Sequence, residues 1–126
     1  MKKANKKANA AIIIIGNEIL SGRTQDVNVV SISKWLNKLG VKVEEVRAIP
    51  DLEDSIVKTI NDVRKKFKYI FTTGGIGPTH DDITSKSIAK AFKLSYEYHK
   101  EAYKILEKHY GAEKFNEGRK KMAKLP

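Results

Sequence analysis

Apolar residues form two kinds of pattern along the chain, and the unbroken runs mark strands. Residues 12–15 are four isoleucines in a row, followed by Gly16. A β-branched run of this kind is typical of a strand buried on both faces, as in a parallel sheet. Two further β-prone stretches lie at 41–46, before a turn at 49–51, and at 69–73. The pattern therefore predicts three strands.

Apolar residues spaced three or four positions apart mark the helices. They predict three helices, over about 27–39, 52–66 and 83–92, each after one of the strands. Either Asp82 or Thr84 is expected to cap the third of them. A further helix is expected around 102–109, ending before Gly111.

Strand and helix alternate three times, which is the order of right-handed crossovers in a parallel sheet. We therefore predict a three-layer α/β/α sandwich with a mostly parallel sheet. Ligands bind such sheets beyond the carboxyl ends of the strands, so the loops after Ile15, Ala48 and Thr73 should converge on one crevice. A chain of 126 residues makes one domain. We expect it over 10–126, after a frayed basic tail over 1–9.

Composition excludes several classes of protein. The chain has no cysteine, which excludes disulfides, thiolate metal sites and cysteine nucleophiles. Its longest apolar run, at 10–15, is far shorter than the roughly 20 residues of a membrane span. We expect a soluble, cytoplasmic protein with no membrane partner.

The net charge of +10 invites a nucleic-acid interpretation, but its distribution argues against one. Lysines are spread from Lys2 to Lys124, whereas arginines are few. Arginine is the residue that proteins favour for recognising nucleic-acid bases. Nucleic-acid binding stays an alternative, and the charge favours a surface that attracts anionic ligands.

The stretch that follows the third strand is the first candidate site. Three glycines occur in the four positions from Gly74 to Gly77, where backbone amides can approach an anion without obstruction. The helix that follows adds its positive end, so phosphate is the expected ligand. The alternative is a tight turn with no ligand, because neither the ATP-loop pattern nor G-x-G-x-x-G is present. The expected contacts here are Thr73, Gly74, Gly75, Gly77 and Thr84.

Two adjacent acids, Asp81 and Asp82, follow this loop. Carboxylates beside a phosphate repel it unless a divalent cation bridges them, and Mg²⁺ prefers one or two carboxylates with phosphate oxygens. The alternative is that one acid caps the helix and the other is solvated. His80 has no histidine partner at metal-ligand spacing, so a loop histidine is favoured over a zinc ligand.

The first strand-to-helix connection, at 16–28, is long and polar, and such connections are often functional. The alternative for Asp26 is that it caps the next helix. The candidate ligand contacts in this connection are Gly16, Glu18, Ser21, Arg23, Asp26 and Asn28.

Two motifs in the correct order resemble a known family. Ile-Gly-Asn-Glu-Ile-Leu-Ser-Gly-Arg-Thr-Gln-Asp-Val-Asn starts at Ile15, and Thr-Thr-Gly-Gly-Ile-Gly-Pro-Thr-His-Asp-Asp-Ile-Thr starts at Thr72. They look like the molybdopterin-binding MoaB/Mog domain, and among its branches the N-terminal domain of the competence/damage-inducible CinA proteins. The resemblance runs from Ala11 to Pro126.

The resemblance implies an α/β fold of the molybdenum cofactor biosynthesis type, assembled as a trimer or dimer. It implies a phosphorylated pterin or nucleotide at the Gly-Gly-x-Gly loop, Mg²⁺ or another divalent cation, and no tightly bound organic cofactor. The CinA branch is associated with ADP-ribose pyrophosphatase activity, so the chain is expected to be a metal-dependent nucleotide pyrophosphatase. The alternatives are molybdopterin adenylylation, as in the cofactor-synthesis branch, and a non-catalytic pterin-binding or assembly subunit.

Some residues match the family's functional positions, and others depart from its pattern. The family's acidic functional position after the glycine loop falls on Asp82, and the acid in the turn after the second strand falls on Asp51. Both are therefore catalytic candidates. Asp81 matches the CinA branch, where the other branch has arginine, while His80 stands where proline is usual. The resemblance ends before the family's last strands, so it implies either a site completed by another chain or a fragment with a damaged site.

Overall fold

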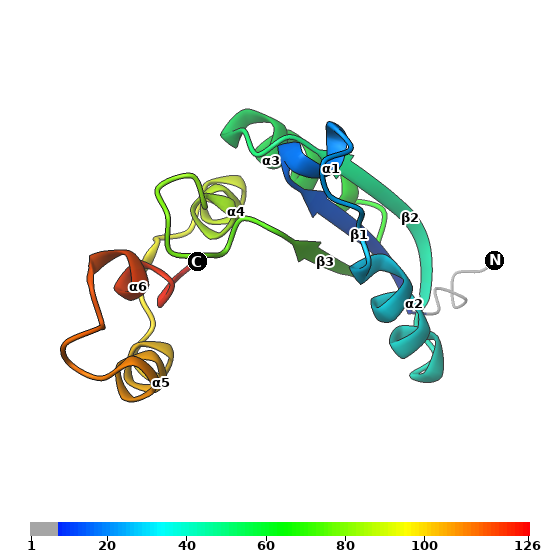
Figure 1. Cartoon of the computed structure of the whole chain (residues 1–126). Helices are drawn as coiled ribbons and strands as arrows, with labels where there is room; N and C mark the ends of the chain where they lie inside the picture. The colour runs from blue at the N-terminus through cyan, green and yellow to red at the C-terminus, as the bar shows by residue number, and fades with distance from the viewer. Residues whose placement is uncertain (1–7) are drawn as a thin grey trace.

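The computed structural model describes residues 8–126, and its elements alternate in the predicted order (Figure 1). The N-terminal part consists of β1 (Asn9–Ile15), α1 (Asn17–Leu20), α2 (Asn28–Lys38), β2 (Lys42–Ile49), α3 (Glu53–Val63), β3 (Tyr69–Thr73) and α4 (Thr84–Phe92). The C-terminal part consists of β4 (Glu97–Tyr98), α5 (Lys100–Tyr110), α6 (Glu117–Lys121) and β5 (Lys124–Leu125). In the part of the chain that the structure describes, each helix is too short or too polar to cross a membrane.

The main sheet has the order β2-β1-β3, and both of its strand pairs are parallel. Ile14 of β1 lies opposite Ala48 of β2 and Thr73 of β3. The isoleucine run therefore occupies the central strand, with a neighbour on each side and helices on both faces, and each of its side chains is buried. This confirms the predicted parallel sheet, since only a centrally placed strand needs apolar residues on both faces.

The core is divided between the two faces of β1. Successive strand residues point to opposite sides, so Ala11, Ile13 and Ile15 share one face. They pack against Ile56, Ile60 and Val63 of α3 and Ala91 of α4. The other face is covered by α2, which packs against β2 and buries Leu36. The result is the helix-sheet-helix layering that the sequence predicts.

The first strand begins earlier than predicted, at Asn9 in the segment expected to be a tail. The Asn9 side chain explains the extension. Its Oδ1 accepts a hydrogen bond from the Lys68 amide at 2.9 Å, and its Nδ2 donates to the Lys66 carbonyl at 3.4 Å. These bonds fix the start of β1 to the segment before β3. The rest of the predicted tail, residues 1–7, lies outside the described part of the chain.

The C-terminal part lies beside α4, on the side away from the sheet (Figure 1). Here β4 and β5 pair antiparallel, and β5 packs against α4. Tyr103 of α5 makes edge-on contacts with the rings of Tyr98 and Phe115, at centroid distances of 5.4 and 5.0 Å. This arrangement brings the last residues of the chain back to the helix that follows the glycine turn.

Candidate functional site

The turn after β3 requires glycine for reasons of packing. Gly74 and Gly75 have φ of 92° and 69°, in the region that favours glycine. A Cβ at Gly74 would lie 2.0 Å from the carbonyl oxygen of Ile15, and one at Gly75 would lie 2.1 Å from Oγ1 of Thr84. The turn therefore places the backbone directly against β1 and α4.

Carbonyl groups hold this turn in place. Thr84 donates its backbone amide to the Gly75 carbonyl at 3.0 Å and its hydroxyl to the Gly74 carbonyl at 2.8 Å. Within the described residues, no hydrogen bond occupies the backbone amides of Gly75 and Ile76. Those two N–H groups are available to an anion. Thr84, predicted to be a ligand contact, is buried, and its hydroxyl supports the turn.

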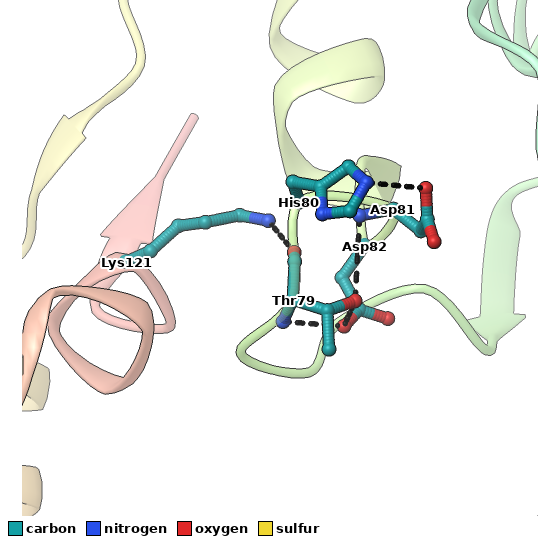
Figure 2. Close-up of polar contacts among 5 residues, drawn as sticks. All are labelled: Thr79, His80, Asp81, Asp82 and Lys121. Atoms are coloured by element: carbon teal, nitrogen blue, oxygen red, sulfur yellow. Dashed lines mark hydrogen bonds and ion pairs between the residues drawn. The ribbon is translucent and has the colours of Figure 1, made fainter.

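Asp82 closes the second half of the loop (Figure 2). Its Oδ2 accepts hydrogen bonds from the amide and the hydroxyl of Thr79, at 2.9 and 2.8 Å. Partial burial alone would raise the pKa of Asp82. However, the hydrogen bonds from Thr79, helped by the nearby Gly77 amide, outweigh burial and hold the pKa of this carboxyl below its usual value. Asp82 is therefore ionised at neutral pH.

The predicted cap of α4 is wrong, because neither Asp82 nor Thr84 caps this helix. Ile83 occupies the position before the first helical residue, and no side chain makes a capping hydrogen bond there. The Asp82 carboxylate is instead committed to Thr79, three residues earlier in the chain. The first amide of the helix, that of Thr84, finds its acceptor in the Gly75 carbonyl.

Asp81 and Asp82 turn their carboxylates in different directions (Figure 2). Asp81 pairs with His80 at 3.3 Å, and both side chains are largely exposed, so the pair contributes little stability. The described residues include no cluster of three or more acids or histidines that could enclose a metal ion. Asp82 fits the single-carboxylate mode of Mg²⁺ binding, since it is ionised and Oδ1 makes no hydrogen bond with the described residues.

The first connection and the end of β3 share one cavity, of about 190 Å³. Glu18, Asp26 and Asn28 line it from the connection, and Thr73 and Gly74 line it from β3. Two of the three loops predicted to converge therefore do so. The third, after β2, does not contribute to this cavity, because Ile49 and Pro50 line a separate one beside α3.

Several predicted contacts serve the structure of the connection itself. Asp26 lies one residue before Val27, the N-cap of α2, and its Oδ2 accepts a hydrogen bond from the Val29 amide at 3.0 Å. It thus satisfies an amide in the first turn of α2, in line with the capping alternative for this residue. The hydroxyl of Ser21 donates to the Glu18 carbonyl and accepts from Nε of Arg23, at 3.3 and 3.1 Å. The buried Gly16 donates its amide to the Ile49 carbonyl at 3.0 Å.

A second cavity, of about 150 Å³, lies on the other side of the glycine turn. Gly75, Ile76, Gly77 and Asp82 line it from the loop, and Ser85 lines it from α4. The other lining residues come from beyond α4 and include Tyr96, Lys121 and Lys124. Asp51 lines neither this cavity nor the one at the first connection. These C-terminal residues were not predicted as part of a site, since lysines spread along a chain carry no local signal that they meet.

Comparison with known proteins shows which family the sequence matches. Residues 11–126 match the model of a family described as a probable molybdopterin binding domain. A CinA-like protein from Chloroherpeton thalassium is 42% identical over 94 residues, which are 75% of this chain and 22% of that protein. The chain spans less than half the length of the curated relatives with which it was compared.

Solved structures agree with the fold. The crystal structure of a CinA protein of unknown function from Thermoplasma acidophilum superposes with a TM-score of 0.86 at 33% identity, covering 94% of this chain and 70% of that one. The structure of a molybdopterin biosynthesis Mog protein from Mycobacterium ulcerans gives a TM-score of 0.57 at 26% identity, covering 66% of this chain and 55% of that one. The fold of this chain is thus found in proteins of both branches.

Proposed function

The chain belongs to the molybdopterin-binding domain family, and from this premise we propose that it binds a phosphorylated pterin or nucleotide at the glycine turn and hydrolyses a pyrophosphate bond there. The observation that carries the proposal is the pair of amides at Gly75 and Ile76, which no hydrogen bond within the described chain occupies. Gly75 and Ile76 line a cavity that Asp82, which is ionised, also lines. Backbone amides beside a helix start are a recurrent phosphate-binding arrangement.

The two cavities beside the turn give the proposed ligand room for two parts. A phosphate on the amides of Gly75 and Ile76 would lie in the cavity that Asp82 borders. The cavity at the first connection, lined by Thr73, Glu18 and Asn28, offers hydroxyl, carboxylate and amide groups. These are the groups that recognise the polar edge of a pterin or a ribose.

Asp82 would hold a Mg²⁺ ion together with phosphate oxygens and water. Such an ion neutralises charge on a phosphoryl group and lowers the pKa of bound water. Thr79 keeps the Asp82 side chain in one position through Oδ2, and Oδ1 is left for the ion. Asp81, whose pairing with exposed His80 is weak, would add a second carboxylate by rotating its side chain.

The test is to incubate the purified chain with ADP-ribose, FAD or ATP in the presence of Mg²⁺ or Co²⁺ and identify products by mass spectrometry. We expect cleavage at the pyrophosphate bond, dependent on the cation. Asp82→Asn should abolish turnover and keep the fold, since asparagine still accepts a hydrogen bond from Thr79. Asp54→Asn, at an exposed position in the first turn of α3, is the matched control and should retain the activity. Full turnover by Asp82→Asn would refute the proposal.

A second candidate, a non-catalytic binding or assembly subunit, is favoured by two observations. One oxygen of Asp82 is already used to hold the loop, and no three-member acid or histidine cluster occurs in the described residues. In this case calorimetry would detect binding of AMP or ADP-ribose, and mass spectrometry would find no product. Product formation from ATP and a pterin would instead support molybdopterin adenylylation.

A further inference from the structure

A lysine pocket of about 360 Å³ adjoins the cavity at the glycine turn. Its three lysines come from three elements, Lys86 from α4, Lys121 from α6 and Lys124 from β5. Asp82, Tyr96, Lys121 and Lys124 line both spaces. The pocket and the turn are therefore neighbouring parts of one anion-facing surface.

The charge in this pocket is strongly one-sided. Within the described residues, Lys86, Lys121 and Lys124 take part in none of the ion pairs. The one carboxylate in the lining belongs to Asp82, and its Oδ2 already accepts from Thr79. Three ammonium groups around one partly used carboxylate repel one another unless an anion enters. A phosphate with two negative charges would leave the pocket close to neutral.

Two of the ammonium groups are held in place. Nζ of Lys121 donates a hydrogen bond to the Thr79 carbonyl, so it lies directly beside the loop that Asp82 closes (Figure 2). Nζ of Lys124 lies over the rings of Tyr96 and Tyr98, 5.6 and 5.1 Å from their centroids. Cation–π contacts and a carbonyl acceptor keep the charge of a lysine while they restrict its motion. Restricted groups lose less entropy on binding an anion.

We propose that the lysine pocket binds the second phosphate of a pyrophosphate-containing ligand whose first phosphate lies on the amides of Gly75 and Ile76. This inference rests on the proposed function and names the class of ligand that the site prefers. A pyrophosphate has two linked anionic groups, and the molecule offers two adjoining anion sites. A monophosphate occupies one site and leaves the other unfilled. The chain should therefore select ligands with two linked phosphates over those with one.

The experiment uses inorganic pyrophosphate and inorganic phosphate as probes, titrated calorimetrically into the 126-residue chain without divalent cations. We expect pyrophosphate to bind about tenfold or more tightly than phosphate, a difference of about 1.4 kcal/mol or more, because its second phosphate pairs with the lysines. Combining Lys121→Met with Lys124→Met should reduce this ratio to about threefold or less, because it should weaken pyrophosphate binding more than phosphate binding. Lys34→Met with Lys38→Met, on α2, is the matched control and should keep the wild-type ratio.

Circular dichroism checks that the variants fold. If the double variant does not fold, Lys86→Met replaces it, because no side-chain hydrogen bond or ion pair in the described residues involves Lys86. Lys86→Met should then lower the ratio by about threefold. A folded pocket variant that keeps the full wild-type ratio would overturn the inference.

An NMR titration that follows the backbone amide signals of Gly75 and Ile76 distinguishes failure of this inference from failure of the proposed function. If pyrophosphate shifts the amide signals of Gly75 and Ile76 but the lysine variants keep the wild-type ratio, the lysine pocket alone is refuted. If neither anion shifts those signals, the glycine turn does not bind phosphate and both proposals fail. Shifts at both amides together with a ratio that depends on the lysines support both.

Discussion

Asp82 accepts two hydrogen bonds from Thr79 through a single carboxylate oxygen, one from the backbone amide at 2.9 Å and one from the hydroxyl at 2.8 Å. This contact closes the loop between the glycine turn and α4. It also fixes the one acid that borders both the turn cavity and the lysine pocket. The same side chain thus supports the loop and is available to the proposed ligand.

Loop closure by Asp82 should make stability depend on pH. The folded-state pKa of Asp82 is lowered, so its contribution is present above the ordinary carboxyl pKa of about 4 and is lost as pH falls through the folded pKa. Asp82→Asn cannot titrate. Urea unfolding should therefore show wild type more stable than Asp82→Asn at neutral pH, with the gap shrinking below about pH 4.

The control for this titration is Thr79→Val, which removes the hydroxyl donor and keeps the amide. It should lower the free energy of unfolding at neutral pH by about 0.5–1.5 kcal/mol. It should also weaken the pH dependence, because the ionised form of Asp82 loses one of its hydrogen bonds. A gap between wild type and Asp82→Asn that stays constant down to about pH 2 would contradict the structure.

Gly74 should tolerate alanine far less well than Gly40. Both residues have positive φ, 92° and 82°, so each alanine bears backbone strain of about 1–2 kcal/mol. A Cβ at Gly40 meets open space, whereas one at Gly74 meets the Ile15 carbonyl at 2.0 Å. Gly74→Ala should therefore destabilise the chain by a further 1–3 kcal/mol or so, measured by chemical unfolding. Equal losses in the two variants would show that the turn is not packed against β1.

Asp26 should act on stability through its capping bond to Val29. Removing the acceptor with Asp26→Ala should cost about 0.5–2 kcal/mol. Asp26→Asn keeps a capping oxygen and should stay within a few tenths of a kcal/mol of wild type. Thermal and urea unfolding measure both effects. If the asparagine variant loses as much stability as the alanine variant, the carboxylate charge matters more than the cap.

Ile13 of β1 is fully buried at the centre of the core, where its side chain packs against α3 and α4. Ile13→Ala should lower the free energy of unfolding by about 2–5 kcal/mol, from lost burial and the cavity left behind. Val30→Ala, on the exposed side of α2, should change it by about 0.5 kcal/mol or less. A small effect at Ile13 in urea unfolding would mean that β1 is not the central strand.

Much of the fold was predictable because its signals are local. Four isoleucines in a row require burial on both faces, and only the central strand of a covered sheet provides it. The helix predicted at 27–39 occurs as Asn28–Lys38, and the strand predicted at 69–73 occurs as Tyr69–Thr73. The start of β1 was missed, since the bonds from Asn9 reach partners nearly sixty residues away.

The candidate site was predictable only in part. The sequence located the glycine turn, because positive φ and close backbone contact both require glycine. It offered two roles for Asp26, and the bond to Val29 shows the capping one. It also treated Asp81 and Asp82 as a pair, although rotamers and neighbouring donors give their carboxylates different directions.

The amino-acid sequence by itself determined the alternation of strands and helices, the buried central strand and the position of the turn, because hydrophobic period and backbone freedom act between near neighbours. Tertiary structure alone decided that Lys86, Lys121 and Lys124 surround one pocket beside that turn. They come from separate elements, and their meeting depends on how β5 packs back against α4. Lysines that lie far apart in the sequence form a charged site only when packing brings their elements together.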